Sequence, residues 1–171
     1  MTLFRGVAAL LVLSLALVLQ VSLFPHFAWR GVVPNLALLI VVGAALVRGP
    51  QAGAMLGFLA GVLVDLAPPA DHVAGRWALA LVVVGFLAGR LRQETRPSAS
   101  AVLLAVAAAS FLGSSVFALS GLVLQDPVVP VAEMMQVILI AVVWDVLLTP
   151  LVLPPVMALF RRLEPARVAW T

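Results

Sequence analysis

Cysteine, tyrosine and lysine are absent from this 171-residue chain, and only 10% of its residues are charged. Without cysteine there can be no disulfide, no thiolate metal ligand and no cysteine nucleophile. A water-soluble domain carries about 25% charged residues, so this chain lacks the polar side chains that would cover a globule in water. Because 64% of the residues are hydrophobic, we expect lipid to surround most of the side chains.

The basic residues do not form a nucleic-acid-binding surface, although the net charge is +3. All ten are arginines, and they lie singly or in short groups between apolar runs, with no aromatic residues interleaved among them. We therefore expect no nucleic-acid partner, and membrane topology to explain where the arginines lie.

Long apolar runs divide the chain into six expected helices. Some are shorter than the ~20 residues that cross a bilayer at right angles. The first run could also be a secretory signal peptide, but it is long for one and no small-x-small cleavage site precedes Pro25, so we expect a retained helix. The helices are expected at residues 6–24, 32–47, 51–66, 77–91, 101–124 and 131–160, in a single transmembrane domain that covers residues 1–171.

The arginines test the number of spans independently. With six spans, Arg30 and Arg76 lie on one side of the membrane, and the other eight lie on the side of the two termini. Cytoplasmic segments carry the excess of basic residues, so both termini are expected in the cytoplasm; an odd number of spans would scatter the pattern, which favours six or four. The fold class is therefore an all-α integral membrane protein, expected to have six transmembrane helices.

Glycines recur at four-residue spacing in the third run, at Gly53, Gly57 and Gly61, and a further pair, Gly85 and Gly89, lies in the fourth. Each glycine lowers helix propensity by about 1 kcal/mol relative to alanine, while helices in lipid associate through such small residues. The glycine row predicts a packing face. That face meets either another helix of the same chain or a helix of a partner.

Prolines punctuate the second and sixth runs. Asn35 after Pro34 is typical of a helix start. Pro150, Pro154 and Pro155 lie inside the sixth run, where they favour a kinked helix, or a broken helix of the kind found in transporters.

Apart from Glu133 at the start of the sixth run, Asp65 and Asp145 are the carboxylates inside the apolar runs, where ionisable groups mark function by default. Asp65 is expected in the outer third of the bilayer, as a cap or paired with His72 or Arg76. Asp145 is expected at or below the midplane, so the two carboxylates should not meet, which weakens any paired acid–base proposal. No phosphate loop, metalloprotease motif or serine-hydrolase motif is present, and Asp71 with His72 lacks a third metal ligand. We expect no catalytic site, metal or cofactor.

Residues 34–92 combine a Pro-Asn helix start, an Arg-Gly turn and two Gly-Phe-x-x-Gly segments, the first followed by aspartate and the second by arginine. These motifs lie at Pro34-Asn35, Arg48-Gly49, Gly57-Phe58 to Gly61 with Asp65, and Gly85-Phe86 to Gly89 with Arg90. With them the chain resembles the MreD family of rod shape-determining proteins.

The resemblance implies a non-enzymatic scaffold for cell elongation in the bacterial cytoplasmic (inner) membrane. Its implied partners are an MreC-like single-span protein, the synthase pair of RodA and a class B penicillin-binding protein, indirectly MreB filaments, and membrane lipid. The implied architecture is similar to that of the substrate-binding components of energy-coupling-factor transporters, with six helices around an outward-facing pocket. The residues expected at partner or helix-packing contacts are Arg48, Gly53, Gly57, Phe58, Gly61, Asp65, Arg76, Gly85, Gly89 and Asp145.

Two other functions stay open. A small-molecule uptake component predicts a ligand-sized outer pocket with convergent polar groups; against it, the first helix lacks the Ala-x-x-x-Ala spacing of those transporters and the outer loops offer few polar groups. A membrane enzyme predicts several titratable groups at one depth, which the sequence does not supply.

Overall fold

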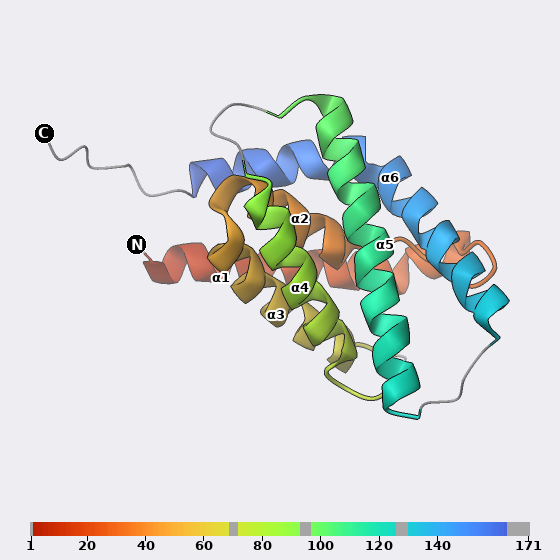
Figure 1. Ribbon diagram of the computed structural model, residues 1–171. Coiled ribbons are helices and arrows are strands. Elements are labelled where there is room, and N and C mark those ends of the chain that lie inside the picture. The colour runs from red at the N-terminus through yellow and green to blue at the C-terminus, as the bar shows by residue number, and fades with distance from the viewer. Residues whose placement is uncertain (1, 69–71, 93–96, 126–129, 164–171) are drawn as a thin grey trace, which may run out of the picture.

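The structure is a computed structural model that describes residues 2–68, 72–92, 97–125 and 130–163. Over these residues the chain forms six α-helices and one 3-10 helix, so the prediction of an all-helical protein is confirmed (Figure 1). The helices are α1 (Thr2–Ser22), η1 (Phe24–Phe27), α2 (Leu36–Arg48), α3 (Pro50–Leu66), α4 (Arg76–Arg90), α5 (Ala99–Val123) and α6 (Val131–Arg162).

Helix α2 begins at Leu36, four residues later than the apolar run that predicts it. The reason is local. The side chain of Asn35 accepts a hydrogen bond from the backbone N–H of Leu38 at 3.0 Å, which makes Asn35 the N-cap. Just before it, an isolated bridge pairs Trp29 with Val32 in a tight turn. Asn35 is therefore a helix-start residue, as the sequence indicates.

Helix α2 lies at the centre of the bundle. All of its residues from Leu36 to Val47 are buried, and it contacts α1, α3, α4, α5 and α6. Because its sequence is apolar on every side, no face is suited to water, and burial among other helices is the arrangement such a helix requires. Its length and central place set the positions of the polar groups at its two ends.

A single glycine joins α2 to α3. Gly49 has a φ of +89° and caps both helices, and Pro50 follows at the first position of α3. A positive φ is available to glycine at little cost, and proline is suited to a first turn where its missing N–H would have no partner. This turn brings α3 back alongside α2, with α4 packed on α3 in turn.

The carboxyl ends of α2, α4 and α6 gather at one end of the bundle. Arg48 at the end of α2 donates a hydrogen bond to the carbonyl of Leu163 at 3.0 Å, just after α6. Arg92 lies close to Gly49.

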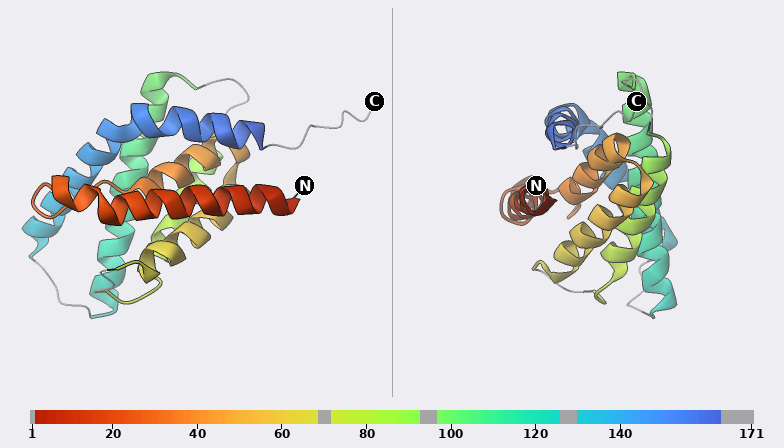
Figure 2. Two further views of the ribbon diagram at one scale, coloured as in Figure 1. Left: turned by 180° about the vertical axis from the view of Figure 1, so that it is seen from behind. Right: turned by 90° about the vertical axis from the view of Figure 1, so that its left-hand side faces the viewer.

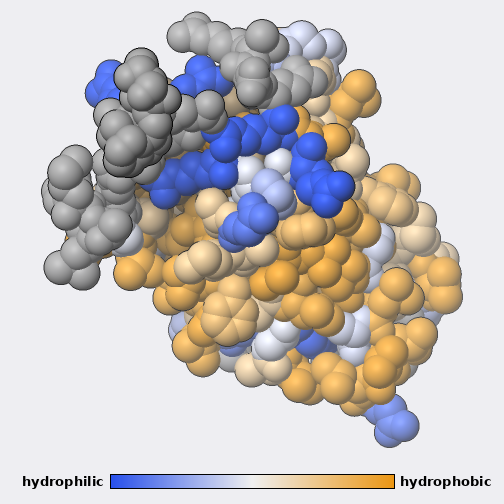
Figure 3. Space-filling model, turned by 60° about the vertical axis from the view of Figure 1, so that its left-hand side comes forward, coloured by the Kyte–Doolittle hydropathy of each residue, from blue (hydrophilic) through white to orange (hydrophobic). Residues whose placement is uncertain are grey.

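Helix α1 begins and α6 ends on this same side of the molecule (Figures 1 and 2). We call this the arginine end; it also carries Arg90, Arg161 and Arg162, the last-turn residues of α4 and α6. Figure 3 shows hydrophilic side chains gathered at one end of the molecule, and hydrophobic ones over most of the rest of the face in view.

Two helices, α5 and α6, are long and apolar enough to cross a membrane, and shorter apolar helices include α2, α3 and Gly6–Ser22 of α1. Helix α6 remains one helix through Pro150, Pro154 and Pro155. It bends along its length (Figure 1), as expected where prolines remove backbone donors. Its two halves therefore point in different directions (Figure 1).

Candidate functional site

Asp65 caps the start of α4 from the end of α3. Its Oδ2 accepts hydrogen bonds from the backbone N–H groups of Gly75 at 2.9 Å and Ala78 at 3.0 Å. Its Oδ1 accepts one from the backbone of Trp77 at 3.1 Å, and His72 Nε2 lies 3.0 Å from the same atom. A carboxylate at a helix N-terminus satisfies donors that have no partner within the helix and interacts favourably with the helix dipole. The predicted cap is therefore present, with His72 as the side-chain partner.

Arg76 points to α5 instead of to Asp65. Its Nη2 and Nε donate to the carbonyl of Phe117 at 2.8 and 3.3 Å, and its guanidinium lies 3.9 Å from the centre of the Phe117 ring. The same ring stacks on Trp77 with centroids 4.5 Å apart and meets His72 edge-on at 5.1 Å. Gly121 makes room for the guanidinium, because a Cβ there would overlap it. These contacts tie α4 to α5 at the end opposite the arginine end.

The start of α2 lies at the same level of the bundle, and its backbone donors are satisfied by side chains from elsewhere. Gln20 of α1 accepts from the N–H of Leu36 at 2.8 Å and of Ala37 at 3.4 Å. Asn35 caps its own helix. Buried N–H groups without partners cost free energy, so a fully buried helix such as α2 needs these polar side chains.

Asp145 completes this arrangement from the middle of α6. It is 1% exposed; its Oδ1 accepts from the backbone N–H of Asn35 at 2.7 Å, and its Oδ2 accepts from Ser110 Oγ of α5 at 2.6 Å. One turn later, Thr149 Oγ1 donates to the carbonyl of Asp145 at 2.7 Å. Asp145 thus joins α2, α5 and α6 at one point.

A cavity of about 380 Å³ lies beside one hydrogen-bond partner of each carboxylate. It is lined by His72, which contacts Asp65, and by Asn35, which contacts Asp145. Asp145 is expected at or below the midplane, away from the depth of Asp65, and its depth in a bilayer stays a prediction. In the structure Asp145 is bonded to the backbone N–H of Asn35, the N-cap of α2. Among the described residues the two carboxylates share no hydrogen-bond donor.

Polar groups without protein partners face this cavity. Gln20 and Asn35 each use the side-chain oxygen in capping α2. Among the described residues no hydrogen bond engages their –NH₂ groups, and both residues line the cavity. Trp77 and Phe117 form an aromatic wall. The cavity therefore offers two amide donors beside an apolar surface.

The glycine row of α3 packs against α4. A Cβ added at Gly57 would lie closer than 3.0 Å to the carbonyl oxygen of Leu81, and one at Gly61 would meet the backbone of Ala78. Gly53 and Gly85 face each other, each within such a distance of the other's carbonyl. Of the two partners that the sequence left open, a helix of the same chain occupies this face.

The remaining predicted residues lie at the ends and on the outside of these helices. Gly89 packs against the Gly49–Pro50 turn. Arg48, besides its bond to Leu163, lies over the ring of Phe160 at 5.2 Å. Phe58 is 53% exposed on α3, on a different face from the glycine row.

Three groups at the site have no motif in the sequence. They are Gln20, Ser110 and Phe117. For Gln20 and Ser110 the available signal in the sequence was that each is a polar residue inside an apolar run, and Phe117 has no such signal. No group of three or more potential metal ligands occurs in the part of the chain that the structure describes.

Comparison with known proteins gives one family. The family model for rod shape-determining protein MreD matches residues 1–163. No curated protein and no solved structure gave a significant match. Because the match covers nearly all of the 171 residues, this chain belongs to the rod shape-determining MreD family.

Proposed function

We propose that the chain is a non-enzymatic, multi-pass scaffold of the cell-elongation machinery in the bacterial cytoplasmic membrane. Family membership supports the role in rod-shape determination. Beyond that role, we propose that the chain links an MreC-like single-span protein to RodA with its class B penicillin-binding protein, and indirectly to MreB filaments. The observation that carries it is that the described chain consists of helices and short connections, so it can act only through lateral helix surfaces and loop ends.

The proposed topology has six spans with both termini in the cytoplasm. Its support is the arginine end, where α2, α4 and α6 finish, and the excess of basic residues expected on the cytoplasmic side. Asp65, His72 and Arg76 then lie towards the periplasm.

Single cysteines test this topology, because the chain has none of its own. Val73→Cys lies before α4 and Ser98→Cys lies after it, both at exposed positions. With a membrane-impermeant maleimide, Val73→Cys should react in right-side-out vesicles and Ser98→Cys only in inverted ones. Reaction of both from the same side would refute the six-span arrangement.

The partner surface proposed on α3 is its outer face around Phe58, since the glycine row is filled by α4. Met55 and Phe58 are exposed there, and an apolar side chain in lipid gains little unless it packs against protein. We expect Phe58→Ala to lower recovery of an MreC-like protein. Phe111→Ala on α5, a comparably exposed phenylalanine, is the matched control and should leave recovery unchanged.

The experiment is purification of the tagged full-length chain in mild detergent, followed by mass spectrometry of the bound proteins, with depletion of the chain in cells alongside. Recovery of an MreC-like protein and loss of rod shape are the expected results. Recovery of neither MreC-like protein nor elongation synthase would refute the scaffold.

The cavity beside Gln20 and Asn35 supports a second candidate, a small-molecule uptake component. At about 380 Å³ the cavity lies within the usual range of ligand sites, about 300–1,000 Å³, and it offers two amide donors. This candidate predicts that an energy-coupling ATPase module or a vitamin-like molecule is recovered in the same purification in place of elongation proteins.

A further inference from the structure

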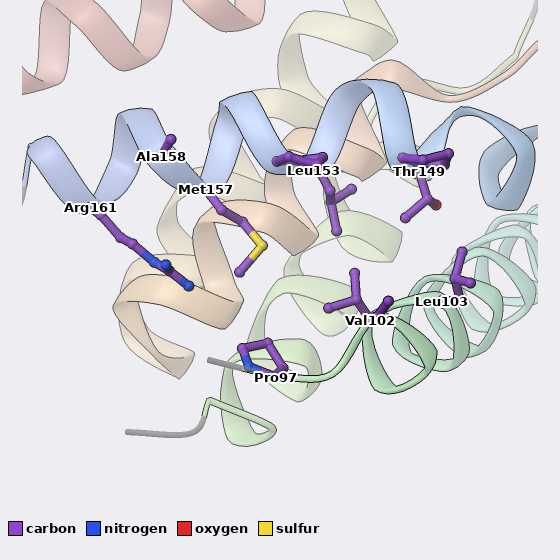
Figure 4. A pocket seen from close by; sticks show the side chains of 11 residues that line it. Pro97, Val102, Leu103, Thr149, Leu153, Met157, Ala158 and Arg161 are labelled. Atoms are coloured by element: carbon purple, nitrogen blue, oxygen red, sulfur yellow. The ribbon is translucent and has the colours of Figure 1, made fainter. Parts of the chain in front are cut away.

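A second cavity, at the other end of the molecule, lies between α5 and the carboxyl half of α6. Its volume is about 520 Å³. Leu153 and Met157 of α6 are buried residues that form its floor, and Val102 and Leu103 of α5 form the facing wall. Figure 4 shows these side chains converging from the two helices. We call this cavity the α5–α6 groove.

The groove is apolar along its length and charged at one end only. Thr149 lies at the inner end, with its hydroxyl already donated to the carbonyl of Asp145. Pro150 and Pro154 also line it, and proline has no N–H to offer a ligand. At the other end lies Arg161, in the last turn of α6 (Figure 4).

Among the described residues, Arg161 has no protein partner. It is exposed, and no hydrogen bond, ion pair or ring contact engages it within the described residues. By contrast, Arg48 is bonded to Leu163 and Arg90 lies 6.0 Å from the ring centre of Phe86. The groove therefore combines an apolar slot with an unpaired cation at its mouth, which is the complement of an anionic amphiphile.

The dimensions of the groove match one leaflet of a bilayer. From Thr149 to Arg161 is 161 − 149 = 12 residues of helix, or about 18 Å, and half of a ~30 Å hydrocarbon core is about 15 Å. An acyl chain in the groove would reach from the surface to the midplane. Its head group would then lie at the arginine end, where basic residues attract anionic lipids.

We propose that the α5–α6 groove binds one anionic phospholipid, with an acyl chain along α6 and the phosphate at Arg161. A partner's helix is the competing occupant. It fits less well, because it would cover the unpaired guanidinium and would need to supply an acidic residue at that depth.

The test is native mass spectrometry of the purified full-length chain in mild detergent, titrated with phosphatidylglycerol or with zwitterionic phosphatidylcholine. Wild type should retain phosphatidylglycerol in preference. Arg161→Gln should lower its binding about fivefold, the factor expected for one arginine at a membrane surface. Arg162→Gln makes the same charge change at the next position, which is also exposed but lies outside the groove, and should alter binding less than about twofold.

A second pair of variants tests the apolar part. Leu103→Trp places a bulky ring in the groove and should reduce retention of both lipids. Leu104→Trp is the same change at the adjacent residue, which is 71% exposed and not part of the groove, and should retain them. Equal loss in Arg161→Gln and Arg162→Gln, or full retention in Leu103→Trp, would overturn the proposal. So would loss of a partner protein from Leu103→Trp with lipid binding unchanged, which would assign the groove to a helix.

Discussion

Substituting alanine for Gly57 tests the close approach of α3 and α4. A Cβ at this position would lie closer than 3.0 Å to the carbonyl oxygen of Leu81, whereas ordinary contact begins at 3.4 Å. The backbones must therefore separate by more than 3.4 − 3.0 = 0.4 Å. A carbonyl of the main chain cannot rotate away as a side chain could, so the strain falls on the packing of the whole helix pair.

Two opposing effects set the size of the change. Alanine gains about 1 kcal/mol of helix propensity over glycine. Overpacking in a well-packed interior costs about 1–3 kcal/mol, and the upper part of that range applies to a backbone contact. We expect a net loss of about 2 kcal/mol, which lowers the melting temperature by about 4–8 °C for a chain of this size.

The assay is thermal unfolding of the purified chain in one detergent, followed by fluorescence or by loss of monodisperse protein. Gly6→Ala is the matched control, because Gly6 lies in α1 with nothing within 4 Å of an added Cβ. That variant should melt at or slightly above the wild-type temperature. If Gly57→Ala is as stable as wild type, or if both variants shift alike, α3 and α4 are not in backbone contact.

Substitutions at three further positions are expected to act at the carboxylates and their neighbours. Asp65→Ala should destabilise the chain by about 3 kcal/mol, since several buried donors at the start of α4 lose their acceptor. Asp65→Asn should destabilise it by less. Unchanged thermal unfolding of the alanine variant would refute the capping role of Asp65. Asp145→Ala should lower the free energy of unfolding by about 1–3 kcal/mol, because the N–H of Asn35 is left without a partner. Asp145→Asn keeps an acceptor there, so its free energy of unfolding should stay within about 1 kcal/mol of wild type. The same thermal unfolding assay compares the two variants. Gly121→Ala should displace the Arg76 guanidinium and weaken the α4–α5 contact, measured as faster hydrogen exchange at the start of α4, and equal exchange rates would argue against that contact.

Local signals in the sequence were enough for the helices and for some of the caps. The cap of α2 follows from Asn35 after Pro34, although the apolar run alone begins four residues too early, and the turn before α3 follows from Gly49 and Pro50. The capping role expected for Asp65 needs only residues within 13 positions of it. Such features depend on neighbours in the chain, which is why spacing and residue type predict them.

The partners of Asp145 could not be predicted in the same way. Ser110 is 35 residues away and Asn35 is 110 residues away. Their meeting depends on how α2, α5 and α6 cross, and apolar runs in lipid carry no periodicity that fixes those crossings. The glycine row is an intermediate case: its spacing predicts a packing face, but the choice of α4 as the neighbour depends on Gly85 lying opposite Gly53.

The separation of Asn35 and Asp145 has a consequence for synthesis of the protein. The first two helices can meet as soon as both have left the ribosome, because Gln20 of α1 already covers the first donors of α2. The N–H of Asn35 receives its acceptor only when α6 emerges, 110 residues later, which at ordinary translation rates is a delay of roughly 5–20 s. During that interval the start of the central helix relies on water, lipid head groups or an insertion factor. In a chain truncated before α6, the start of α2 therefore lacks its acceptor, so membrane quality control should recognise the chain as incomplete at this early helix as well as at its truncated end.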